Sequence, residues 1–110
     1  MSRIYLSGPI SGYDYNERRQ HFSIIKQMLE KRGHIVFNPL ENGLPRDSST
    51  HEHMRADLRA LCDCDIIVML PKWAHSAGCA REFENAVSIG CKVAFVQSLE
   101  PLVIVETYFE

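Results

Sequence analysis

Hydrophobic and polar positions along the chain form two kinds of pattern that follow each other in turn. Short β-branched and aromatic runs indicate strands, and longer stretches with apolar residues three or four positions apart indicate helices. The run Asp65–Leu70 has no polar alternation, which is typical of a central parallel strand covered on both faces. The expected strands are Arg3–Leu6, His34–Phe37, Asp65–Leu70 and Lys92–Val96, with Leu102–Tyr108 as a candidate fifth.

Three helical patterns lie between these strands. Asn16 is the expected N-cap of the first helix, and Gly33 ends it. The polar loop Glu41–Ser49 is long enough to be a lid or a substrate-contact loop. Because strand and helix alternate four times, residues 1–110 are expected to form a single α/β domain with a parallel sheet, helices on both faces and right-handed crossovers. The expected helices are Asn16–Arg32, Thr50 to about Cys62, and one within His75–Gly90.

Composition narrows the class of protein without naming a function. The chain has 110 residues, 45% of them hydrophobic, and a formal net charge of −2, so bulk charge gives no reason to expect nucleic acid or an anionic membrane as a partner. Its apolar runs fall far short of a bilayer span, and MSRIYLSG lacks the apolar segment of a signal peptide. A cytoplasmic protein with reduced cysteines is expected. Cys62 and Cys64 with His51 and His53 match no zinc spacing, so no metal is expected.

Small and polar residues follow three of the expected strands, where ligands of such folds bind. The turn before the third helix is a natural anion site, because unpaired N–H groups and the positive end of the helix dipole meet there. One turn into that helix, Glu82 lies between apolar neighbours. An anion site beside a carboxylate suggests chemistry on a phosphorylated small molecule. The three polar stretches are Ser7–Gly12, Asn38–Pro39 and Lys72–Gly78.

Two further side chains are each open to two interpretations. Asp57 lies on the same side of its helix as Met54 and Leu61, and a carboxylate there must be paired, hydrogen-bonded or protonated. It either belongs to a functional site or sits at the edge of the apolar stripe, where it caps the backbone or forms a local salt bridge. Trp73 either stacks on a nucleobase or covers the edge of the core.

An ordered set of motifs covers residues 3 to 96: IYLSGPISG, VFNPL, MRADLRALCDCDIIVMLPKW and SAGCAREFENA. Together they resemble the nucleoside 2-deoxyribosyltransferase-like superfamily, and more narrowly its small phage and bacterial branch. The resemblance implies a flavodoxin-like three-layer sandwich with a four- to five-stranded parallel sheet, a homodimer or larger homo-oligomer, and no cofactor. It also implies cleavage of the N-glycosidic bond of a nucleoside or nucleoside 5′-monophosphate.

The same resemblance implies roles for individual residues. Glu82, in a G-x-x-x-E context, is the nucleophile, and Asp57 contacts the base or sugar and assists proton transfer. Tyr5 orients the glutamate. Glu82 is expected to stay ionised near the helix N-terminus, and Asp57 to carry the proton if burial raises its pKa. The substrate-binding residues expected at the polar loops are Gly8, Pro9, Ile10, Gly12, Asn38, Trp73, Ser76 and Gly78.

The position six residues before the glutamate indicates the kind of substrate. Nucleotide hydrolases that this chain resembles hold the 5′-phosphate with a serine there, and Ser76 matches it. A hydroxyl at a helix N-terminus donates to a phosphate, whereas a carboxylate repels it. Pro9 and Ser11 replace a Ser and an Arg that some of these hydrolases use around the phosphate, which removes a bidentate partner. The cations available to compensate are Arg81, Lys72 and Arg55.

Two other functions stay open beside an enzyme. The chain could be a non-catalytic module that binds or senses nucleotides, or a small domain used for oligomerisation, since a fold does not fix a function. The presence of Tyr5, Asp57 and Glu82 together favours the enzyme, because a binding module needs no nucleophile. The tail Tyr108–Glu110 is a candidate to complete the site of a neighbouring subunit.

Overall fold

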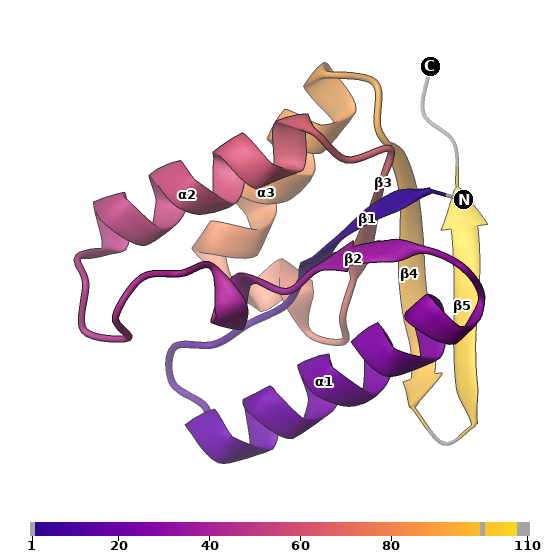
Figure 1. Cartoon of the computed structure of the whole chain (residues 1–110), viewed down its shortest axis with the longest axis horizontal. Helices are drawn as coiled ribbons and strands as arrows, with labels where there is room; N and C mark the ends of the chain where they lie inside the picture. Colours follow the sequence, from indigo (N-terminus) through magenta and orange to yellow (C-terminus); the bar gives the residue numbers. More distant parts are fainter. Residues whose placement is uncertain (1, 100, 108–110) are drawn as a thin grey trace.

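In a computed structural model of the chain, which describes residues 2–99 and 101–107, five strands form one sheet with helices on both of its faces (Figure 1). The predicted α/β, flavodoxin-like three-layer sandwich is confirmed. In chain order the elements are β1 (Arg3–Ser7), α1 (Tyr15–Lys31), β2 (Ile35–Phe37), the 3-10 turn η1 (Pro39–Glu41), α2 (Thr50–Cys62), β3 (Ile66–Met69), the 3-10 turn η2 (Trp73–His75), α3 (Ala77–Ser88), β4 (Lys92–Leu99) and β5 (Leu102–Thr107).

The strand order is β2-β1-β3-β4-β5, and β1 to β4 are parallel. The order reverses between β1 and β3, which is the position where open α/β sheets bind ligands. The fifth strand differs from a purely parallel sheet, because β5 pairs antiparallel with β4. Only two residues separate β4 from β5, whereas a parallel connection needs a dozen or more. Tyr108, the last residue of the expected fifth strand, lies outside the described residues, as do Phe109 and Glu110.

Side chains of β1 alternate between the two faces of the sheet, as the period of two in a strand requires. Ile4 and Leu6 pack with residues of α1, whereas Tyr5 packs with residues of α2 and α3. The helix α1 lies on one side of the sheet, and α2 and α3 lie on the other (Figure 1). The core on the α1 side consists of Ile4, Leu6, Phe22, Ile25, Leu29, Val36, Val68, Leu70, Ala94 and Val96. The core on the other side consists of Tyr5, Leu61, Ile67, Met69, Cys79, Ala86, Cys91 and Val93.

Each long helix begins at a side chain that accepts from a backbone N–H. Asp14, and not Asn16, caps α1, since its carboxylate accepts from the N–H of Glu17 at 2.9 Å. The prediction placed this cap two residues late; Asp is as good a capping residue as Asn, and the helix begins at Tyr15. A capping box that pairs Ser49 with Glu52 starts α2, and Ser76 caps α3.

The turn after β1 needs glycine at two positions for different reasons. A Cβ on Gly8 would lie 2.9 Å from Leu70 Cβ and 3.1 Å from Phe22 Cζ, so the backbone there approaches the core too closely for a side chain. Gly12 has a φ of +85°, a conformation that other residues rarely adopt. Both glycines lie in the loop that connects the carboxyl end of β1 to α1.

Candidate active site

Glu82 is buried at the centre of the α2–α3 face. Cys79, Glu82 and Ala86 form the buried side of α3, and only 7% of Glu82 is exposed. Two residues of β1 that point to this face meet its carboxyl group. The Tyr5 hydroxyl donates to Oε2, and the Ser7 hydroxyl donates to Oε1 at 3.0 Å. The predicted pairing of Tyr5 with Glu82 is therefore present, and Ser7 is a second partner that the sequence reasoning did not single out.

Burial raises the pKa of Glu82 to about 7, because the charged form loses its water. The hydrogen bonds from Tyr5 and Ser7 lower this pKa, and the charge of Asp57 raises it. The expectation that the helix N-terminus keeps Glu82 fully ionised is thus wrong. Glu82 lies in the second turn of α3, and the dipole effect falls off within the first turn. Burial also raises the pKa of Tyr5 well above its usual value, which keeps its hydroxyl protonated as a donor.

Asp57 lies within electrostatic reach of this pair. Its charge acts on the pKa values of both Glu82 and Tyr5, although α2 carries Asp57 and α3 carries Glu82. Burial raises the pKa of Asp57, and a hydrogen bond from Asn42 lowers it. The raised pKa agrees with the expectation for a group that carries a proton. Asp57 makes no ion pair in the described part of the chain, so the interpretation as a local salt bridge does not hold.

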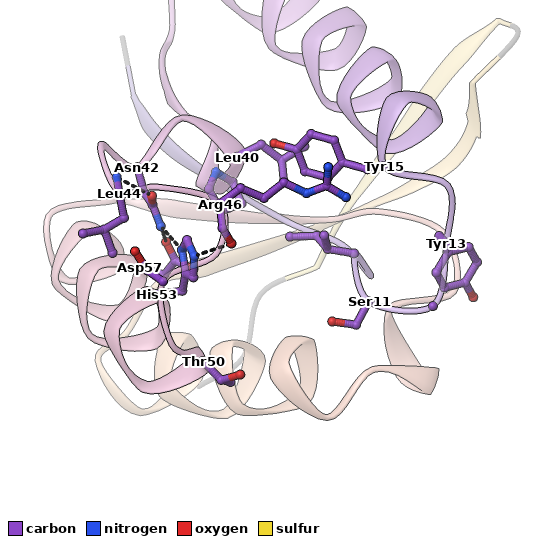
Figure 2. A pocket seen from close by; sticks show the side chains of 14 residues that line it. Ser11, Tyr13, Tyr15, Leu40, Asn42, Leu44, Arg46, Thr50, His53 and Asp57 are labelled. Carbon is purple, nitrogen blue, oxygen red and sulfur yellow. Dashed lines mark hydrogen bonds between the residues drawn. The ribbon is translucent and has the colours of Figure 1, made fainter.

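A cavity of about 430 Å³ opens beside Asp57 (Figure 2). Its walls are the loop after β1, the segment from η1 to Ser48 and the first turns of α2. Of the predicted site residues, the cavity is lined by Ile10, Gly12 and Asp57. Ser11, in the predicted stretch Ser7–Gly12, also lines the cavity. Asn42, Arg46 and Ser48 come from the loop Glu41–Ser49, which the sequence predicts as a lid or substrate-contact loop. Thr50 and His53 are the polar lining that the sequence reasoning missed. The Arg46 guanidinium lies 3.6 Å from the centre of the Tyr15 ring, and this pair connects the loop to α1.

Several predicted substrate-binding residues do not line the cavity and instead make contacts that stabilise the fold. The Asn38 side chain is buried, accepts from Leu40 N–H and donates to Glu41. Trp73 stacks on Phe83 with ring centres 5.0 Å apart, which supports the interpretation that it covers the edge of the core. Gly8 and Pro9 are buried, and Gly8 is required by packing.

Ser76 and Gly78 form the N-terminus of α3, where the sequence predicts an anion site. The Ser76 hydroxyl accepts from Cys79 N–H at 3.3 Å, and as a hydroxyl it still has its own hydrogen to donate. Gly78 has ordinary space around it, since an added Cβ would lie 3.9 Å from Met54 Cε. Lys72, just before this turn, has a φ of +68° and places its ammonium 5.8 Å from the Tyr13 ring.

The described residues contain no group of three or more His, Cys, Asp or Glu side chains arranged to hold a metal ion. They also contain no helix of the length and apolar character that crossing a bilayer requires.

The comparison of sequences finds no match among the curated proteins. Residues 2–95 match one protein-family model, described as "Domain of unknown function (DUF4406)". The chain belongs to this family. The family description itself assigns no activity, so the solved structures that resemble this DUF4406 protein carry the comparison further.

Three solved structures share its fold. A 2-deoxyribosyltransferase from Bacillus psychrosaccharolyticus is 27% identical, with a TM-score of 0.70 over 98% of this chain and 85% of that one. The CMP N-glycosidase BcmB of Clostridium botulinum is 20% identical, with a TM-score of 0.61 over 84% of this chain. A 2-deoxyribosyltransferase from Leishmania mexicana is 16% identical, with a TM-score of 0.68 over 87% of this chain. The DUF4406 chain spans 66% of the Clostridium protein and 64% of the Leishmania protein, slightly less than two thirds of each. The resemblance to the nucleoside 2-deoxyribosyltransferase-like superfamily is confirmed.

Proposed function

We propose that this protein cleaves the N-glycosidic bond of a nucleoside or nucleoside 5′-monophosphate, with Glu82 as the nucleophile. The observation that carries the proposal is the buried Glu82 carboxyl, held by the hydroxyls of Tyr5 and Ser7 and electrostatically coupled to Asp57. A buried carboxyl group of raised pKa is a marker of functional sites. Glu82 does not itself line the cavity, but Asp57, whose charge acts on Glu82, does. The similar structures are described as deoxyribosyltransferases and a CMP N-glycosidase, which supports the same reaction class.

In the first step, ionised Glu82 attacks the anomeric carbon of the sugar through an oxocarbenium-like transition state. A bond forms between the Glu82 carboxylate oxygen and the anomeric carbon. The bond from that carbon to the base nitrogen breaks, and its electron pair leaves with the base. Asp57 gives its proton to the departing base, which avoids expelling a base anion. Tyr5 and Ser7 keep the Glu82 carboxyl oriented throughout.

In the second step, an acceptor attacks the anomeric carbon of the glycosyl-enzyme and Glu82 leaves as a carboxylate. Asp57, now ionised, takes the proton that the acceptor loses. Water as the acceptor gives an N-hydrolase, and a second base gives a deoxyribosyltransferase. The open cavity beside Asp57, lined by Ser11, Arg46 and Thr50, supplies space and polar groups for the substrate.

A 5′-phosphate on the substrate fits the N-terminus of α3. The first backbone N–H groups of that helix lack partners within the helix, and the Ser76 hydroxyl can donate beside them. Ser76 and Gly78 accordingly bind phosphate in this proposal, and Lys72 adds positive charge nearby. On the basis of the family resemblance, the proposal also includes a cytoplasmic location and a homodimer or larger homo-oligomer.

The test is incubation of the protein with a panel of nucleosides and nucleoside 5′-monophosphates, followed by chromatography for free base. A second incubation adds another free base and detects the exchanged nucleoside, which separates transfer from hydrolysis. We expect base release in the wild type and a loss of at least about a thousandfold in Glu82→Gln. Substrate binding, measured by calorimetry, should persist in that variant. Binding without base release by the wild type would overturn the enzyme in favour of a binding module, and normal turnover by Glu82→Gln would overturn the nucleophile.

A further inference from the structure

Asn42, in the polar loop after η1, connects three parts of the cavity wall through one amide group (Figure 2). Its nitrogen lies 3.0 Å from Asp57 Oδ1 and 3.0 Å from His53 Nδ1. Its oxygen accepts from Leu44 N–H at 3.1 Å. The other ring nitrogen of His53, Nε2, lies 3.3 Å from the carbonyl oxygen of Arg46. The loop is thereby tied to α2 at the residue just one turn before Asp57.

Only one arrangement of protons satisfies these contacts. The Arg46 carbonyl can only accept, so Nε2 of His53 carries a hydrogen. The Asn42 oxygen accepts from Leu44 N–H, so the Asn42 nitrogen is the atom that donates to Nδ1 of His53. The Asn42 amide then donates one hydrogen to Nδ1 and the other to Asp57 Oδ1. The reversed amide would direct its NH₂ at the Leu44 N–H and its oxygen at the Asp57 carboxylate, so both contacts would become repulsive. The contacts with Leu44 and His53 therefore fix the orientation of Asn42.

This arrangement distinguishes the two oxygens of Asp57. Oδ1 accepts from Asn42, whereas Oδ2 has no hydrogen-bond partner among the residues that the structure describes. A proton on Oδ1 would collide with the Asn42 hydrogen, so a protonated Asp57 carries its proton on Oδ2.

We propose that Asn42, oriented by His53, is a positioning residue that fixes the Asp57 carboxyl group and makes Oδ2 the oxygen that gives the proton to the leaving base. The inference rests on the proposed glycosidic cleavage and adds the loop Asn42–Arg46 to its working parts. In the step itself, the O–H bond at Oδ2 breaks as the base nitrogen takes the proton, and the electron pair stays on the carboxylate.

The competing explanation is that Asn42 only stabilises its own loop through the turn at Leu44. The variant Asn42→Ser separates the two, because a serine hydroxyl can accept from an N–H two residues ahead but is too short to reach Asp57. We expect its thermal unfolding to stay close to that of the wild type. We expect kcat to fall roughly ten- to a hundredfold, which corresponds to loss of a hydrogen bond to a charged group, with little change in KM.

A matched pair at His53 tests the orientation of Asn42 without changing Asn42 or Asp57. His53→Phe keeps a ring but removes the acceptor at Nδ1, whereas His53→Asn retains an acceptor near that position. We expect kcat to fall in His53→Phe and His53→Asn to restore most of the loss. Equal loss in both variants would contradict the role assigned to His53.

A readout without substrate keeps this inference separate from the proposed function. Titration of the Asp57 carboxyl carbon by NMR should show a higher pKa in Asn42→Ser than in the wild type, because the hydrogen bond that lowers this pKa is gone. An unchanged pKa overturns the positioning role, whatever the activity. A raised pKa in a protein that releases no base from any substrate overturns the proton donation and the proposed function, and leaves the Asn42–Asp57 contact established.

Discussion

The two faces of β1 show how one short strand supports both stability and chemistry. On one face, Ile4 and Leu6 pack against α1 in a core of apolar side chains. On the other, Tyr5 and Ser7 bring two hydroxyls to a carboxyl group that is almost as deeply buried. Burial that stabilises the first face raises the pKa of Glu82 on the second. The apolar core on the α1 side therefore contributes free energy of folding that offsets the cost of burying the Glu82 carboxylate under α3.

The largest expected effect on stability is on the apolar face. Phe22 is fully buried against β1 and β3, so Phe22→Ala should lower the free energy of unfolding by about 3–5 kcal/mol. If the two faces are independent, the pKa of Glu82 in the variant stays near 7. Chemical denaturation gives the first quantity and NMR titration of the Glu82 carboxyl the second. A shift in that pKa would show that the faces are coupled through the sheet.

Under α3, in contrast, replacement of the buried Glu82 should raise the free energy of unfolding. The carboxyl group of Glu82 titrates near 4.5 when unfolded and near 7 when folded, so ionisation destabilises the fold as pH rises through that interval. Glu82→Gln removes this titration. It should raise the free energy of unfolding by up to about 3 kcal/mol at pH 8. The effect should be small below pH 4.5, where the wild-type carboxyl group is protonated in both the folded and the unfolded state. Denaturation curves at pH 4 and pH 8 test this, and a variant less stable than the wild type at pH 8 would contradict it.

An intermediate effect on stability is expected at Gly8, in the turn that follows β1. In Gly8→Ala the new methyl group would meet Leu70 and Phe22 on the α1 side. Overpacking of this kind should cost about 2 kcal/mol, measured by thermal unfolding. Gly78→Ala is the matched control, because its Cβ would make only ordinary contacts. Equal destabilisation by both changes would argue against the close approach at Gly8.

The smallest change in stability is expected for Tyr5→Phe, which removes one hydroxyl and keeps the ring that stacks on Phe37. The cost should be about 1 kcal/mol. The pKa of Glu82 should rise above 7, because a hydrogen bond that favours its charged form is lost. Since the nucleophile must be ionised, kcat/KM should rise with pH at a higher pH than in the wild type. A pH profile identical to that of the wild type would show that ionisation of Glu82 does not control the reaction.

Much of the fold could be predicted because the determining signals are local. The unbroken apolar run of β3 and the β-branched and aromatic residues of β1 identify strands whatever the rest of the chain does. The sequence predicted only that Glu82 lies between apolar neighbours, and the structure places it with Cys79 and Ala86 on the buried side of α3. The pairing of Glu82 with Tyr5 came from the family resemblance, since 77 residues separate them and no local pattern reports that contact.

The rest depends on contacts that sequence spacing does not reveal. The orientation of Asn42 is set by where its loop meets α2, and the loop has no period from which to infer it. One signal was present: His53 and Asp57 are four residues apart, so they share a face of the helix. Trp73 was ambiguous because a base and Phe83 both stack on the flat face of an aromatic ring, and the sequence does not show which partner that face meets. The raised pKa of Glu82 required knowing how completely α3 and β1 exclude water.

Cys79, one turn before Glu82 on the same buried stripe, offers a native spectroscopic probe of this site. Burial raises the pKa of its thiol, and the Glu82 charge raises it further, so the sulfur keeps its hydrogen while the neighbouring carboxyl ionises. The S–H stretching vibration responds to the local electric field, and a change in the Glu82 charge alters that field. Infrared difference spectra recorded across neutral pH should therefore follow the ionisation of Glu82 directly, with neither label nor substrate.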